Sequence, residues 1–199
     1  MASKGSSVRI RSSPKFIIML KKIFVPGWID TADNHVDYPG LEIWKKKINP
    51  NDKIEAEYVV GHSLGANFAL LNWEKNKNTK LILVGPLLPK RNIFSWLICW
   101  LKFLFTEGTF LNKKRLTTFP HFVSGIRLNL SLLSEDLMET FDRIPHENVI
   151  IIRGKEDKYF FNKKTADALK AKSIKIIEVE KAGHGWNKKF NEEIDKLIK

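Results

Sequence analysis

Five short, almost continuous apolar runs recur along the chain, each of the length of one β-strand. They occupy residues 20–25, 56–60, 80–84, 149–153 and 174–179. Apolar residues at intervals of three or four predict amphipathic helices over about 41–47, 66–74, 163–171 and 188–198. Apolar strands that alternate with such helices are typical of a parallel sheet covered on both faces. The pattern therefore predicts an α/β fold, a three-layer sandwich with a mostly parallel sheet of about five strands.

The alternation is interrupted between about residues 86 and 147, where the pattern is helical. The most apolar run of the chain, residues 93–105, lies in this stretch, but it is too short to cross a bilayer. We interpret residues 86–147 as a helical lid insertion that folds over one end of the sheet. With the strands it forms a single domain over residues 19–199.

Residues 1–18 differ in character from the rest of the chain. They are small, polar and basic, and they lack the long apolar stretch of a signal peptide. We interpret this segment as a disordered tail or as a sequence foreign to the native protein, and we expect it to contribute nothing to the fold.

The chain is basic, with a formal net charge of +12. A basic surface of this kind can bind nucleic acids or anionic membranes. The lysines are dispersed, however, and no arginine-rich stripe or groove-binding motif accompanies them, so we interpret the charge as a solvated surface. The single cysteine, Cys99, excludes an intramolecular disulfide. We therefore expect a cytoplasmic protein without a nucleic-acid partner or a transmembrane segment, and its oligomeric state stays open.

One pentapeptide carries recognisable chemistry. Gly61-His62-Ser63-Leu64-Gly65 comes directly after the second predicted strand and before a predicted helix. In that context G-x-S-x-G predicts a nucleophile elbow, a sharp turn that projects a serine hydroxyl. The outer glycines remove side chains that would collide with the strand and the helix. Ser63 is therefore the candidate nucleophile.

A serine hydroxyl needs a base, most often a histidine, and the base needs an acid to orient it. In nucleophile-elbow enzymes the chain order is serine, acid, histidine. Three histidines follow Ser63, and only His184 lies after the last predicted strand, in a glycine-flanked loop. His121 lies in the insertion and His146 precedes a strand, so we interpret both as turn or surface residues. We predict that His184 is the base.

The acid should follow the penultimate predicted strand, in the turn over residues 154–157. Asp157 is the predicted acid, and its neighbour Glu156 is the residue most able to replace it. A plain turn or helix-capping role is the alternative for Asp157.

Three segments in this order resemble the α/β-hydrolase superfamily, and the resemblance covers most of residues 20–199. They are GHSLG at 61–65, RGKED at 153–157 and AGHGW at 182–186. The chain is most similar to small, minimal, esterase-like serine hydrolases, whose first strand leads directly into the oxyanion loop.

The resemblance implies an oxyanion hole made of two backbone N–H groups. One belongs to Leu64, the residue after the nucleophile, and the other to Trp28, in the loop after the first strand. The family often has His-Gly in that loop, whereas this chain has Pro26-Gly27, and an aromatic wall is the alternative role for Trp28.

These residues predict a serine hydrolase that cleaves a small or medium carboxylic ester through an acyl-enzyme, with no cofactor and no metal. The apolar residues of 93–111 favour a small-molecule acyl substrate with an apolar portion. Packing of the lid on the sheet, a dimer contact or peripheral contact with a membrane would also explain them. The polar residues Asp30, Asp33, His35 and Asp37 have no recognisable metal-loop spacing, so we interpret them as turn residues.

Two alternatives from other classes stay open. One is a non-catalytic binding protein built on the same scaffold. The other is a different chemistry of the same triad, such as acyl transfer, thioester, amide or lactone cleavage, cofactor-free haloperoxidation or carbon–carbon bond hydrolysis.

Overall fold

A computed structural model of the chain describes residues 20–28, 30–41, 43, 54–75, 77–90, 92–107 and 130–198. Three predictions fall outside the described residues. They concern the tail at 1–18, the helix from about 41 to 47 and the middle of the insertion, which contains His121.

Five parallel strands form one sheet in the order β1-β2-β3-β4-β5. The strands are β1 (Leu20–Val25), β2 (Ala56–His62), β3 (Lys80–Val84), β4 (Val149–Gly154) and β5 (Lys175–Val179). Each coincides with one of the five apolar runs, and the predicted sheet is confirmed. Because all five strands are parallel, the turns that follow them meet at one edge of the sheet.

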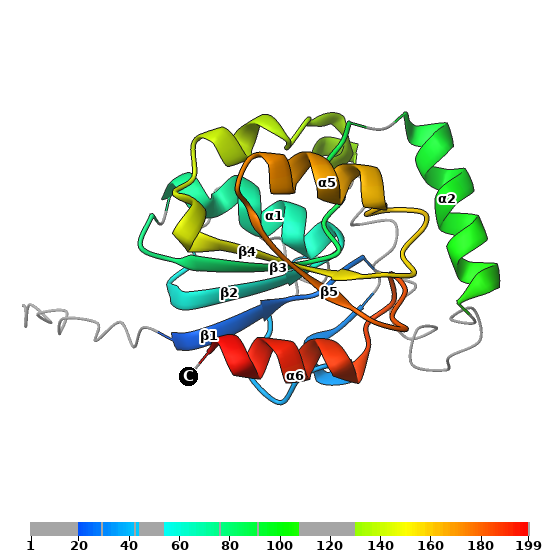
Figure 1. Ribbon diagram of the computed structural model, residues 1–199. Helices are drawn as coiled ribbons and strands as arrows, with labels where there is room; N and C mark the ends of the chain where they lie inside the picture. Colours follow the sequence, from blue (N-terminus) through cyan, green and yellow to red (C-terminus); the bar gives the residue numbers. More distant parts are fainter. Residues whose placement is uncertain are drawn as a thin grey trace, which may run out of the picture.

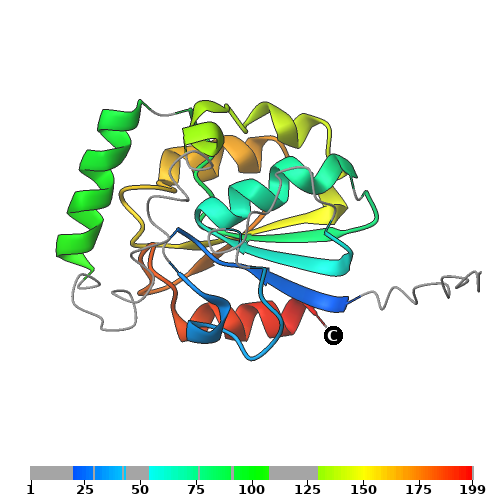
Figure 2. The ribbon, with the colours of Figure 1, turned by 180° about the vertical axis from the view of Figure 1, so that it is seen from behind.

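Helices cover both faces of this sheet, so the three-layer prediction is also confirmed (Figures 1 and 2). Helices α1 (Leu64–Asn72) and α5 (Lys163–Ala171) lie on one face, and α6 (Lys188–Leu197) lies on the other. The side chains of Asn162 and Asn187 cap α5 and α6 by accepting hydrogen bonds from Thr165 N and Lys189 N. Short 3-10 helices are also present: η1 (Ala32–Asn34), η2 (Trp73–Lys75), η4 (Glu139–Asp142) and η5 (His146–Asn148).

Alternate residues of each central strand enter two different apolar cores. Val59, Leu83 and Ile151 pack into the core under α1 and α5. Their neighbours Val60, Ile82 and Ile152 pack into the core under α6, together with Phe190 and Ile194. Because both faces of the sheet are buried, these strands have apolar residues at consecutive positions instead of at every second one.

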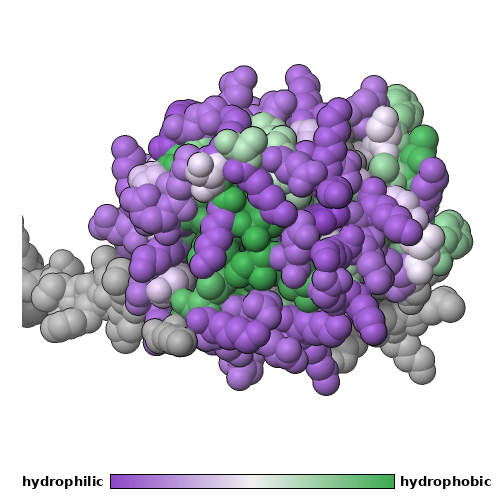
Figure 3. Space-filling view, in the orientation of Figure 1, coloured by the Kyte–Doolittle hydropathy of each residue, from purple (hydrophilic) through white to green (hydrophobic). Residues whose placement is uncertain are grey.

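Helix α2 (Ile93–Thr106) stands beyond the carboxyl ends of the strands (Figure 1). Its inner face buries Trp96, Phe103 and Leu104. Its outer face leaves Phe94 73% and Phe105 75% exposed, and apolar surface is visible along this helix at the right-hand edge of Figure 3. Within the described ranges, no helix is long and apolar enough to cross a membrane. That residues 86–147 form a lid stays a prediction.

Candidate active site

Ser63 forms the sharp turn between β2 and α1. Its φ of 53° and ψ of −122° lie in a region that residues with side chains rarely occupy, which costs on the order of 1–3 kcal/mol and persists only where the surroundings enforce it. The backbone N–H of Ser63 donates to the carbonyl oxygen of Val84 over 2.9 Å, which ties the turn to β3. The sequence predicts a turn across all of residues 61–65, but β2 continues through His62, because His62 still pairs with Val84. The turn is therefore sharper than predicted, and Ser63 alone separates the strand from the helix.

The two glycines of the pentapeptide are required by close backbone packing. A Cβ atom on Gly65 would lie 2.2 Å from the carbonyl oxygen of Val25 in β1. A Cβ atom on Gly61 would lie 2.5 Å from Cα of Ala66 in α1. Both distances are far inside van der Waals contact, so the tight connection that presents Ser63 needs glycine at both positions.

His184 lies in the loop after β5, with its imidazole directed at Ser63. The distance from Nε2 of His184 to Oγ of Ser63 is 3.0 Å. The residue is only 5% exposed, and its ring packs against Phe160 and Phe103 at centroid distances of 4.3 and 5.5 Å. The apolar rings limit the access of water to the imidazole and fix its plane.

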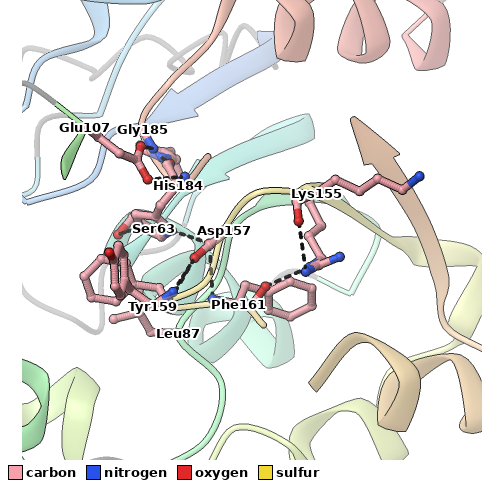
Figure 4. A network of polar contacts seen from close by, with 12 residues as sticks. Ser63, Leu87, Glu107, Lys155, Asp157, Tyr159, Phe161, His184 and Gly185 are labelled. Carbon is pink, nitrogen blue, oxygen red and sulfur yellow. Dashed lines mark hydrogen bonds and ion pairs between the residues drawn. The ribbon is translucent and has the colours of Figure 1, made fainter. Parts of the chain in front are cut away.

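Asp157 lies in the turn after β4, on the far side of the imidazole from Ser63 (Figure 4). Its Oδ2 is 2.7 Å from Nδ1 of His184. The carboxylate also accepts hydrogen bonds from the backbone N–H groups of Tyr159, Phe160 and Phe161 at 3.2, 2.9 and 3.1 Å. Burial by itself raises the pKa of Asp157, but His184 and the backbone N–H groups of Phe160 and Phe161 outweigh burial and hold the pKa below its ordinary value. Asp157 is therefore ionised at neutral pH.

The structure thus brings Ser63, His184 and Asp157 together from the turns after β2, β5 and β4. The competing candidates lie elsewhere: the side chain of Glu156 is exposed, and His146 is exposed in η5. A serine, an imidazole and a buried carboxylate linked in this order can transfer a proton from the hydroxyl to the imidazole.

The two predicted oxyanion residues belong to segments that adjoin Ser63. Leu64 is the first residue of α1, where backbone N–H groups are not used within the helix. Trp28 follows Gly27, and a Cβ atom on Gly27 would lie 3.2 Å from Cβ of Ser63, so this loop runs beside the nucleophile. The indole of Trp28 packs against Trp96 and Trp100 of α2 at centroid distances of 5.1 and 5.3 Å. Its side chain therefore contributes to an apolar wall, and the role of its backbone N–H stays a prediction.

Two residues that the sequence analysis did not select also contact the His184 loop. Nε2 of His62 donates to the carbonyl oxygen of His184 over 3.0 Å. Burial, and then the nearby His184, lower the pKa of His62 to about 3, so its ring is neutral at neutral pH. The carboxylate of Glu107, just after α2, accepts from the backbone N–H groups of His184 and Gly185. His62 could have been noted as the histidine beside the nucleophile, and Glu107 as the acidic residue that ends an apolar helix.

Two of the polar residues around position 30 contact each other. The imidazole of His35 is hydrogen-bonded to the carboxylate of Asp30, and both side chains are nearly buried. Across the described ranges, no group of three or more histidine, cysteine, aspartate or glutamate side chains is placed to hold a metal ion.

Sequence comparisons find no relative, because no family model and no curated protein matches the chain. Structural comparison does find similar folds. MGS-M2, an α/β-hydrolase enzyme from a deep-sea metagenome library of the Medee basin, matches with a TM-score of 0.58 at 13% identity, over 91% of this chain and 88% of that one. The N-formylmaleamic acid deformylase of Pseudomonas putida S16 matches with a TM-score of 0.55 at 12% identity, over 83% of this chain and 86% of that one.

Proposed function

We propose that this chain, which has the fold of the α/β hydrolases, is a serine hydrolase that cleaves a small or medium carboxylic ester. One observation carries the proposal. A continuous chain of hydrogen bonds runs from Oγ of Ser63 through both ring nitrogens of His184 to Oδ2 of Asp157, with distances of 3.0 and 2.7 Å. It is supported by the strained backbone of Ser63, a feature that folded proteins retain mainly at functional sites.

The proposed reaction begins with proton transfer. Nε2 of His184 accepts the hydroxyl proton of Ser63 while Oγ attacks the acyl carbon, and a tetrahedral intermediate forms. The ionised Asp157 holds Nδ1 of His184 in its protonated state, which leaves Nε2 free to act as the base. His184 then donates the proton to the leaving alcohol, and the acyl group remains on Ser63. Water, activated by the same imidazole, hydrolyses this acyl-enzyme and restores the serine.

The developing oxyanion is stabilised by backbone N–H groups in this mechanism. Leu64 supplies one from the first turn of α1, and the loop containing Trp28 supplies the other. Loss of one such donor typically costs about 10²- to 10³-fold in kcat. The chemistry uses only protein groups and requires neither a metal nor a cofactor.

The substrate is proposed to carry an apolar acyl or alkyl portion. Trp28, Trp96 and Trp100 form a cluster of indole rings beside the loop that flanks Ser63. Phe103 and Phe160 cover the imidazole of His184. A site bordered by aromatic rings favours an apolar group next to the acyl carbon.

Labelling with a fluorophosphonate probe, measured by intact mass, tests the proposal. The native chain should gain one adduct, because an activated serine displaces fluoride from the probe. Ser63→Ala should gain none, and His184→Ala should react far more slowly. His146→Ala, which removes an exposed histidine in η5, is the matched control and should label like the native chain.

A folded native chain that stays unlabelled would overturn the proposal and favour a non-catalytic binding protein. If labelling succeeds, hydrolysis of p-nitrophenyl esters with acyl chains of increasing length tests the apolar preference. A thioester and an anilide in the same panel separate ester cleavage from the related reactions of the triad.

A further inference from the structure

Glu107 joins helix α2 to the loop that carries His184. Oε1 accepts a hydrogen bond from the backbone N–H of His184 over 3.1 Å, and Oε2 accepts one from Gly185 over 2.8 Å. The close-up view shows this carboxylate beside the two residues (Figure 4). Hydrogen bonds to an ionised carboxylate are stronger than those between neutral groups. One side chain therefore binds two consecutive amides of the loop.

The contact with Glu107 explains why glycines flank His184. A Cβ atom on Gly183 would lie 2.5 Å from Oε1 of Glu107, and one on Gly185 would lie 3.1 Å from Oε2. A side chain at position 183 would therefore push the carboxylate away. Glycine on both sides of His184 lets the carboxylate reach the backbone between them.

His184 is held by three groups from three parts of the fold. Asp157 binds Nδ1 of its ring, His62 binds its carbonyl oxygen, and Glu107 binds its N–H. Asp157 and His62 belong to the sheet and its turns, whereas Glu107 follows α2. Phe103, one turn earlier in α2, packs against the ring of His184. Helix α2 therefore contacts the backbone and the side chain of the same residue.

We propose that Glu107 is a positioning residue for the hydrolytic reaction, an inference that rests on the proposed function. Its carboxylate holds the His184 loop so that Nε2 stays within hydrogen-bond distance of Ser63 Oγ. Glu107 touches no reacting atom and acts through His184. As a consequence α2 and the catalytic loop form one unit, and a displacement of the helix would misalign the base.

Replacing Glu107 tests this role through the rate of reaction. Glu107→Ala removes both acceptors, and we expect kcat to fall about 10- to 100-fold, as small misplacements of catalytic groups do. KM should change little, and fluorophosphonate labelling should slow by the same factor as kcat. Glu107→Gln retains one acceptor oxygen, so its kcat should lie between those of the native chain and the alanine variant. Glu147→Ala, which removes an exposed acid in η5, is the matched control and should react like the native chain.

A second variant tests the same contact from the other side. Gly183→Ala should displace the carboxylate and reproduce most of the loss seen in Glu107→Ala. In the double variant the added methyl group meets no carboxylate, so Gly183→Ala should cause little further loss. Two losses that multiply in the double variant would overturn the proposed contact.

Amide exchange gives a measurement that does not depend on activity. In ¹⁵N NMR spectra of the full chain, the amides of His184 and Gly185 should exchange faster in Glu107→Ala, while the amides of β3 keep their native rates. Faster exchange with an unchanged kcat would overturn the positioning role, and unchanged exchange would overturn the contact. If the native chain is not labelled at all, the proposed function fails and the positioning role fails with it, whereas the exchange rates still decide whether Glu107 holds the loop.

Discussion

The ring of His62 donates a hydrogen bond from Nε2 to the carbonyl oxygen of His184 over 3.0 Å. The residue that precedes the candidate nucleophile thus supports the loop that carries the candidate base. This bond requires a proton on Nε2, since a carbonyl oxygen only accepts, whereas burial and the nearby His184 disfavour a second proton on the ring. The stability of the fold should therefore depend on the titration of His62.

Stability should fall as the pH is lowered from about 6.5 toward 3. Burial and the nearby His184 lower the pKa of His62 from 6.5 to about 3, so in this window the unfolded chain binds a proton that the folded chain does not. The stability from His62 is present above the ordinary pKa and is lost with a slope of up to about 1.4 kcal/mol per pH unit. Urea unfolding at a series of pH values measures this slope.

His62→Gln retains an N–H donor but does not titrate, so its curve should be flatter in the same window. His146→Gln, on the surface, should follow the native curve. The lowered pKa of Asp157 also reduces stability as the pH is lowered, but only below the ordinary aspartate pKa of 3.8. The contributions of His62 and Asp157 to the stability curve are therefore separable. Equal slopes in the native chain and His62→Gln would contradict the prediction.

Asp157→Asn should reduce both activity and stability. The neutral amide no longer selects the required tautomer of His184, and in serine enzymes the equivalent change lowers kcat about 10⁴-fold. The carboxylate also accepts three backbone N–H groups, and an amide nitrogen facing one of them should cost about 1–3 kcal/mol. Ester hydrolysis and urea unfolding measure the two effects. Glu156→Gln changes the exposed neighbouring acid and should leave both unchanged; if it alone abolishes activity, Glu156 is the acid.

Two glycine substitutions should affect different properties: Gly65→Ala should lower stability, and Gly27→Ala should lower the reactivity of Ser63. Gly65→Ala places a methyl group 2.2 Å from a backbone oxygen of β1, and relief requires backbone movement that should cost about 1–3 kcal/mol or more. Gly27→Ala places one at 3.2 Å from Cβ of Ser63 and from Nδ1 of His62, a milder clash that a movement of a few tenths of an ångström relieves. We therefore expect Gly27→Ala to fold with near-native stability but to label more slowly at Ser63. Thermal unfolding and probe labelling distinguish the two, and a stable Gly65→Ala variant would contradict the tight packing of the elbow.

The two faces of α2 should differ in their effect on stability. Trp96 is 4% exposed, and truncation of such a buried aromatic residue to alanine typically costs about 3–5 kcal/mol. Phe94 is 73% exposed, so Phe94→Ser should change the free energy of unfolding by less than about 0.5 kcal/mol. Urea unfolding of both variants measures the difference. A large loss in Phe94→Ser would mean that the outer face is covered in solution, which sedimentation at several concentrations would reveal.

The strands could be predicted because the fold buries them on both faces. A strand such as β3 then consists almost entirely of apolar residues, and this local property is visible without any knowledge of its partners. The bounds predicted for helices α5 and α6 agree with the structure almost to the residue, because apolar periodicity is also a local signal.

The sequence by itself determined the strand–helix order, the position of the elbow around Ser63, and Asp157 and His184 as its candidate partners. These predictions follow from local periodicity and from the chain order serine, acid, histidine of nucleophile-elbow enzymes. Only the tertiary structure decided that Glu107 binds the backbone beside His184 and that His62 binds its carbonyl oxygen. Both contacts join residues far apart in the chain, and their partners are backbone groups, which are the same at every position and which no residue type identifies.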